Sequence, residues 1–482
     1  MLFSALCLVL LGGNPARAQK QGSSAPPPIP AYRPPLGGII GATNSDAGQN
    51  SDQTEPVHQP LSGVQNLTLG VEPGRSYWQP HFDVFGTGDS NAQELARGPN
   101  WITWISASAG VDVHRAGGIS DLTFGYTSGG MYTNQAGVSN GIVQALSFAD
   151  RLSFRRSTLS FFDQASYLPE SAFGFGGLGG AGVTENGLNL PGLAFNPGQT
   201  VLTGRGKMLN NSDAVEFEEL LTRRSSLTFS GGYSLLRDFG SGSDLFDYGV
   251  VNARGGYNRQ LTQKDTVAII YTFADYRYSG SSQSVIDHTL QLSYGRLIAG
   301  KLAFQVAGGP QAYLSQTSTA LTGTGAGNGQ AGPASVLTTQ TQVQWSLSSS
   351  LQYQDRRYGL GLSYNHGVNG GAGVMIGALT DTVTGSLSRQ MSRTFASGFN
   401  GGYARTQGLP GGGAFANQSY SYWFGGLNLT EPLGATVGLT VSYQVQYQTS
   451  NSAACVGPTC GANTLRHLIS IGLGWHERPL LF

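Results

Sequence analysis

Residues that could carry out acid–base or nucleophilic chemistry are few and scattered along the chain. A hydrolase site needs a nucleophile and a base within hydrogen-bond reach, with a third group to orient the base. Asp112 and His114 are two residues apart and share one face of a predicted strand. Asp287 and His288 are adjacent and point to opposite faces. Simple solvated polarity explains the Asp112 and His114 pair better than catalysis does.

One string, GVSNG at residues 137–141, matches a nucleophile elbow with Ser139 at its centre. The elbow needs a strand before the serine and a helix after it. Here a glycine-rich loop precedes and a strand follows, so a chance match in a Gly/Ser-rich chain is the better interpretation. The sequence shows no histidine-rich metal spacing and no phosphate-binding loop. We therefore expect no enzyme activity, no cofactor and no metal site.

The composition excludes several classes of protein. Glycine accounts for 72 of 482 residues, and charged residues make up 11%, against roughly 25% in ordinary soluble proteins. Lys and Arg together number 27, as do Asp and Glu, so the chain lacks the basic face that nucleic acid requires. After the first dozen residues no apolar run reaches the length of a membrane helix, about 18 residues.

The N-terminal part of the chain is predicted to be processed and linker-like. Residues 1–18 resemble a secretory signal peptide, because an apolar core is followed by Ala16-Arg17-Ala18, an A-x-A cleavage site. Residues 19–76, rich in Pro, Gly and Ser, are predicted to be a disordered periplasmic linker, with a partner-docking segment as the alternative. Cys455 and Cys460 are predicted to form a disulfide in an exported chain.

A strand pattern repeats from residue 77 to the end of the chain. In residues 435–448, ATVGLTVSYQVQYQ, every second residue is apolar and the others are polar but uncharged. Successive strand side chains point to opposite faces. A soluble sandwich could bury the apolar face, whereas a membrane barrel would turn it toward lipid and line a wet interior with the polar face.

The whole chain favours the membrane barrel. We count about eighteen strands, with sixteen as the alternative, and every second connection is short. Arg155-Arg156, Arg356-Arg357 and residues 431–434 are examples of the short turns. Residues 169–212 and 315–340 are predicted to be long loops. Residues 77–482 are therefore predicted to form a closed, all-β, antiparallel transmembrane β-barrel with short periplasmic turns and long outside loops.

Aromatic residues near strand ends are expected to form girdles at the membrane interfaces. The candidates are Trp101, Tyr126, Tyr278, Tyr358 and Trp475. The alternative is that they are ordinary core aromatics.

Polar residues on the opposite faces are candidates for lining the lumen. Most are neutral amides and hydroxyls, which would suit neutral hydrophilic solutes such as sugars. Residues 169–212 could fold inside and narrow the bore, and deleting them should then raise the conductance. The candidate lumen-lining residues are Asp112, His114, Asp121, Arg151, Glu216, Glu218, Asp287, Gln342, Gln344, Gln444 and Gln446.

Two segments resemble known outer-membrane proteins. In the last strand Ile469, Ile471, Leu473 and Trp475 alternate with small or polar residues, and the chain ends in Phe482. This resembles the C-terminal signal recognised by the barrel-insertion machinery, which the resemblance implies as a partner alongside outer-membrane lipid. Pro479 departs from the pattern because proline cannot donate to a ladder. We therefore expect the strand to stop near Trp475 and the tail to trail into the periplasm.

The segment HFDVFGTGDSN at residues 81–91, followed by WISASAGVDVHR and DLTFGY, resembles the start of the β-barrel porin 2 type of outer-membrane protein. The resemblance covers residues 81–126 and implies a channel in the bacterial outer membrane, of a type suspected of serving exopolysaccharide export. A polysaccharide would then be a partner. Two alternatives remain: a surface structural or adhesion barrel, and a barrel enzyme whose loops build a site around Ser139, His114 or Asp112.

Overall fold

The computed structural model describes residues 76–91, 101–133, 140–168, 208–239, 247–279, 283–298, 301–320, 335–355, 358–371, 375–392, 395–410, 418–451, 463–478 and 480–481. The signal peptide, the linker up to residue 75, Ser139, Cys455, Cys460, Phe482 and residues 169–207 lie outside this described part.

The described part is built from β-strands. Eighteen of them are 12–20 residues long, and a two-residue strand follows near the C-terminus. The strands are β1 (Tyr77–Asp89), β2 (Ile102–Ala116), β3 (Ser120–Tyr132), β4 (Gly141–Ser153), β5 (Ser157–Leu168), β6 (Met208–Thr222), β7 (Ser225–Asp238), β8 (Tyr248–Gln260), β9 (Asp265–Tyr278), β10 (Ser284–Ile298), β11 (Leu302–Ala320), β12 (Ser335–Gln354), β13 (Tyr358–Asn369), β14 (Ala378–Gln390), β15 (Ala396–Gly408), β16 (Ser419–Pro432), β17 (Val437–Ser450), β18 (Thr464–His476) and β19 (Leu480–Leu481).

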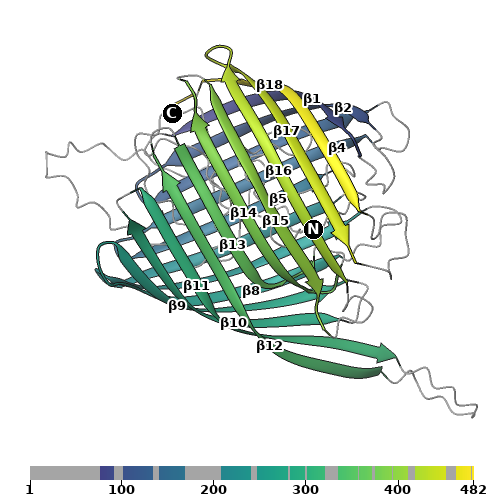
Figure 1. Ribbon diagram of the computed structural model, residues 1–482. Helices are drawn as coiled ribbons and strands as arrows, with labels where there is room; N and C mark the ends of the chain where they lie inside the picture. The colour runs from purple at the N-terminus through teal and green to yellow at the C-terminus, as the bar shows by residue number, and fades with distance from the viewer. Residues whose placement is uncertain are drawn as a thin grey trace, which may run out of the picture. The chain divides into compact units, whose positions relative to one another are not determined.

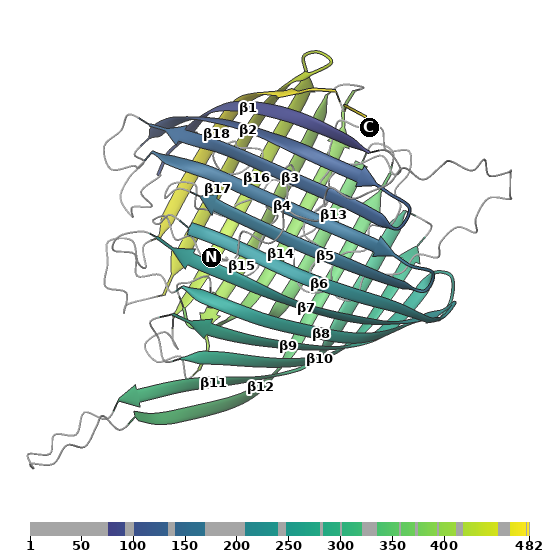
Figure 2. The same cartoon turned by 180° about the vertical axis from the view of Figure 1, so that it is seen from behind.

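Each strand from β1 to β17 pairs antiparallel with the next one in the sequence, and β1 pairs with β18 to close the sheet (Figure 1). The closing ladder runs from His81 opposite His476 to Asp89 opposite Leu468. Figure 2 shows the barrel from behind, with β1 to β10 toward the viewer. Closure pairs the backbone groups of the first and last strands, so the sheet has no open edge. The predicted eighteen-strand antiparallel barrel is confirmed.

Connections of two lengths alternate around the barrel. Those at residues 117–119, 154–156, 223–224 and 433–436 are short, and the first and last long strands begin and end on the same side as these turns. The longer connections lie at the other ends of the strands. We refer to these two sides as the short-turn end and the long-loop end.

Four segments differ from the sequence prediction. Residues 315–320 and 335–340, predicted to be loop, continue the β11–β12 ladder as far as Ala320 opposite Ser335. Their Ser- and Thr-rich composition favours a loop, but β-branched Thr also fits a strand. Strand β6 begins at Met208, inside the predicted loop 169–212. The C-terminal tail returns to the sheet, because Leu480 and Leu481 pair with Trp78 and Tyr77 of β1.

The alternation predicted for the strands is confirmed. In β17, Tyr443 and Tyr447 are exposed on the outward face, whereas Gln444 and Gln446 are buried on the inward face. Exposed large apolar side chains lie on the outward face around the barrel, for example Ile105, Leu292, Leu362 and Ile471. No helix among the described residues has the length and hydropathy needed to cross a membrane.

Candidate functional site

The inner wall of the barrel carries three groups of side chains that define the candidate site. The seam network joins β1 to β18 at the long-loop end. The His–Asp cluster lies toward the short-turn end of β18, β1, β2 and β3. The long-loop cluster is an apolar group on the inner wall at the long-loop end.

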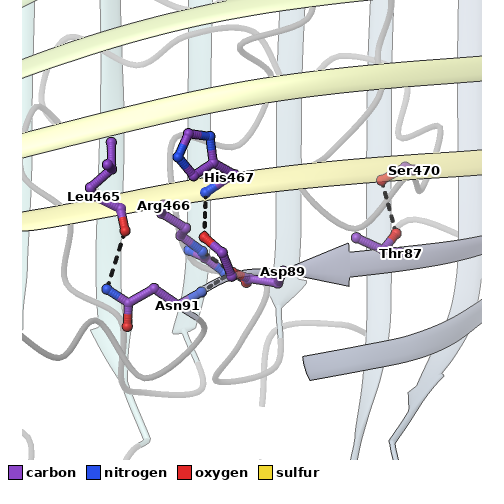
Figure 3. A network of polar contacts seen from close by, with 8 residues as sticks. Thr87, Asp89, Asn91, Leu465, Arg466, His467 and Ser470 are labelled. Carbon is purple, nitrogen blue, oxygen red and sulfur yellow. Dashed lines mark hydrogen bonds and ion pairs between the residues drawn. The ribbon is translucent and has the colours of Figure 1, made fainter. Parts of the chain in front are cut away.

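A buried ion pair forms the centre of the seam network (Figure 3). Arg466 of β18 donates from Nε and Nη2 to Asp89 Oδ2 at 2.8 and 2.5 Å. The side chains of Arg466 and Asp89 are 1% and 0% exposed. Charged hydrogen bonds of this kind are short and strong. The pair therefore fixes the register in which the first and last strands meet.

Neighbouring contacts extend the seam network in both directions (Figure 3). The backbone N–H of Asn91 donates to Asp89 Oδ1 at 2.8 Å, and its side-chain amide donates to the Leu465 carbonyl at 3.3 Å. The hydroxyls of Thr87 and Ser470 are 2.9 Å apart. Every one of these contacts crosses or borders the closing seam, so the network stabilises the pairing of β1 with β18.

The His–Asp cluster consists of His81, Asp83, Asp112, His114, Asp121 and His476, all on the inner face. His81 Nδ1 lies 3.2 Å from Asp112 Oδ2, and His114 Nε2 lies 2.6 Å from Asp121 Oδ1. His476 Nε2 lies 4.0 Å from Asp83 Oδ1. Asp112 and His114 share the inner face as predicted, but each lies against a residue of a neighbouring strand and not against the other.

Glycines on the adjacent strands make room for this cluster. A Cβ at Gly110 would meet the His81 ring, and a Cβ at Gly474 would meet Asp83 Oδ1. His81 and Asp83 therefore lie flat against the wall. Two carboxylate oxygens of the cluster are buried with no hydrogen-bond partner: Asp83 Oδ2 and Asp112 Oδ1. Within the described part of the chain no group of His, Cys, Asp and Glu has the arrangement of a metal site.

The other predicted lumen residues also occupy inward positions, but they are spread around the barrel. The Thr289 hydroxyl donates to Asp287 at 3.0 Å. Tyr313 donates to Gln342 at 2.5 Å, and the Gln344 amide donates to Gln311 at 3.2 Å. Arg151 on β4, Glu216 and Glu218 on β6, and Gln444 and Gln446 on β17 complete the set.

The long-loop cluster is the part of the inner wall that the sequence prediction missed. It is buried and apolar, not polar. Tyr278, predicted to belong to an interfacial girdle, is part of it, and the prediction for this residue was wrong because its position in the alternation directs it inward. The cluster contains Ile102, Trp104, Met131, Val143, Ala145, Leu236, Tyr248, Val250, Ala274, Tyr278, Val285, Tyr313, Ile376 and Leu409.

A connection between β13 and β14 enters the barrel and joins this cluster. The Tyr278 hydroxyl donates to the Gly370 carbonyl at 3.1 Å. A Cβ at Gly377 would lie 3.0 Å from Val285 Cγ2 on β10. Gly371 and Gly377 both have positive φ, 73° and 70°, a conformation that favours glycine. Residues 370–371 and 375–377 therefore reach several strands across the long-loop end and narrow it.

Three histidines face outward, away from the lumen. His366 stacks on Trp345 with ring centroids 3.9 Å apart, and its Nδ1 lies 2.7 Å from Asp381. His288 and His467 contact the hydroxyls of Tyr271 and Tyr443. All three histidines lie near the long-loop ends of their strands. They are therefore separate from the candidate lumen site.

Comparison with known proteins finds solved structures of low sequence identity. No protein-family model and no curated protein matches the chain. Among solved structures, OccK2 of Pseudomonas aeruginosa shares 11% identity over 84% of this chain and 98% of its own, with a TM-score of 0.42. OccAB1 of Acinetobacter baumannii shares 11% over 86% and 100%, with a TM-score of 0.41. Fiu of E. coli K12, a ferric-catecholate import receptor, shares 8% over 84% and 82%, with a TM-score of 0.42.

Proposed function

We propose that this protein is a channel of the bacterial outer membrane that passes hydrophilic solutes. The observation that carries the proposal is the sorting of side chains across a closed barrel. Large apolar side chains are exposed on the outward face, while the inward face carries most of the buried polar residues. An exposed apolar band around a closed sheet fits hydrocarbon, where only helices and closed barrels satisfy the backbone.

The described connections support the proposed orientation. Bacterial outer-membrane barrels have short periplasmic turns and longer loops outside. The short-turn end would then face the periplasm, together with the beginning of β1 and the end of β18. Eighteen strands are enough for an aqueous channel. The long-loop cluster would form its outer constriction.

The uncharged part of the inner wall supports the proposal that the solute is uncharged and hydrophilic, such as a sugar or a glycan in transit. The inward positions of β11 to β17 carry no charged side chain, and many are amides or hydroxyls. These groups exchange hydrogen bonds with a solute in place of water at little net cost. An exopolysaccharide that is exported through the channel would be a solute of the same class. Representative residues are Gln311, Gln342, Gln344, Ser350, Ser363, Thr382, Thr384, Ser386, Asn400 and Gln444.

Reconstitution tests the channel directly. We expect the protein to make liposomes swell in isotonic solutions of small neutral sugars and to produce discrete conductance steps in a planar bilayer. Replacing Met375 and Ile376 by alanine should raise the single-channel conductance, because both side chains are buried where the connection narrows the long-loop end. Alanine at the outward, exposed Val383 provides the control.

Absence of both swelling and conductance from folded, inserted protein would overturn the channel. A surface structural or adhesion barrel would then be the better explanation. An unchanged conductance in the Met375 and Ile376 variant would place the narrowest point elsewhere.

A further inference from the structure

Charge is distributed unevenly over the inner wall. Carboxylates outnumber guanidinium groups at the inward positions of the described strands, and Lys is absent from these positions. The inward carboxylates are Asp83, Asp89, Asp112, Asp121, Glu216, Glu218, Asp238 and Asp287. The inward guanidinium groups are Arg151, Arg254 and Arg466.

The three arginines offset only part of this excess. Arg466 is taken up by Asp89 in the seam network. Arg151 lies opposite Asp121 in the β3–β4 ladder, and Arg254 interacts electrostatically with Glu216. The remaining carboxylates of the His–Asp cluster are Asp112, 3.2 Å from His81, and Asp83, 4.0 Å from His476.

The carboxylates toward the short-turn end, which we call the acidic arc, lie on one side of the barrel, in two groups with Arg151 of β4 between them. Asp83, Asp112 and Asp121 come from the adjacent strands β1, β2 and β3, and Glu216 and Glu218 follow on β6. The inward positions of β11 to β17 are uncharged, so the field across the lumen comes from one side. Figure 1 shows β13 to β17 in front of the strands that carry this acidic arc.

Two oxygens in the arc lack partners. Asp83 is 2% exposed, yet its Oδ2 accepts no hydrogen bond, and Asp112 Oδ1 is likewise buried without a donor. Leaving a buried charged oxygen unpaired is costly. A positive charge nearby would lower that cost, whereas an anion would raise it. The two carboxylates are therefore suited to attract a cation.

We propose that this acidic arc, comprising Asp83, Asp112, Asp121, Glu216 and Glu218, makes the lumen select for cations and for solutes bearing an ammonium group, and against anions. The inference rests on the proposed channel function. Rings of carboxylates produce cation selectivity in other pores, because low-dielectric walls focus their field. A neutral sugar is unaffected by this field, so the arc adds a charge preference to the proposed passage of uncharged solutes.

The reversal potential of the reconstituted channel under a KCl gradient at pH 8 tests the arc. We expect a K⁺ to Cl⁻ permeability ratio several-fold above one. In the Asp112→Asn/Asp121→Asn variant the ratio should fall toward one with the channel still open. Asp121→Asn alone should give a smaller decrease, and it keeps the fold testable because this side chain is 60% exposed.

Asp150→Asn is the matched control. It removes the same charge from the outward face of β4, where Asp150 accepts a hydrogen bond from Ser120 at 2.8 Å, and it should leave the permeability ratio unchanged. A conducting wild-type channel with a ratio at or below one would overturn the acidic arc and leave the channel standing. So would equal ratios in the wild type and the double variant. A folded protein with no conductance would overturn the proposed function itself.

Discussion

Replacing Arg466 by methionine is expected to lower the free energy of unfolding of the barrel by about 3–5 kcal/mol, because it leaves a buried charge without its partner. Asp89 is fully buried, and both of its bonds from Arg466 would be lost. Methionine fills much of the arginine volume, so most of the loss is electrostatic. Urea-unfolding titration in lipid vesicles, followed by tryptophan fluorescence, measures the change.

Two further variants separate the ion pair from ordinary packing. The double replacement Arg466→Met/Asp89→Leu removes both charges and should recover most of the lost stability. Thr87→Ala removes one neutral hydrogen bond of the same seam, to Ser470, and should cost about 0.5–1.5 kcal/mol. If Arg466→Met is no more destabilising than Thr87→Ala, the ion pair does not hold the seam.

Placing arginine at Leu292 should destabilise the inserted barrel by about 2–4 kcal/mol, because this position lies near the middle of a lipid-facing strand. Leu292 is 65% exposed and lies in the central part of β10. The adjacent Gln291 provides a matched control, since it faces inward and donates to Ser346 at 2.6 Å. Gln291→Arg should lower the free energy of unfolding by about 1 kcal/mol, because that hydrogen bond is lost.

Unfolding titrations of both variants in the same vesicles make the comparison. A similar loss at positions 291 and 292 would mean that the two faces of β10 meet similar surroundings, which contradicts the assignment of the outward face to hydrocarbon.

The strands and their faces could be predicted because alternation is a local property of the sequence. Gln342 and Gln344 are predicted to line the lumen, and the structure places them inward, between the exposed, outward Val343 and Trp345. The same alternation directs Trp104 inward from β2, where it is 1% exposed. Assigning an aromatic residue to an interfacial girdle only because it lies near a strand end failed for Tyr278, which points inward.

The contacts that define the candidate site could not be predicted in this way. Asp89 and Arg466 lie 377 residues apart and meet only when the barrel closes. His114 contacts Asp121 because of the register of β2 against β3, which the sequence left open. The approach of Gly377 to Val285 depends on a connection that crosses several strands. Each of these contacts depends on the closed shape and not on a local pattern.

The account depends most on which face of the sheet meets lipid, and thiol labelling of adjacent cysteines in vesicles tests this directly. In a background without Cys7, Cys455 and Cys460, one cysteine is placed at the exposed Leu362 or at the inward Ser363 of β13. We predict that a charged, water-soluble thiol reagent modifies position 363 and that position 362 reacts only with a lipid-soluble reagent. The reverse pattern, or equal modification of both positions by the charged reagent, would contradict the account.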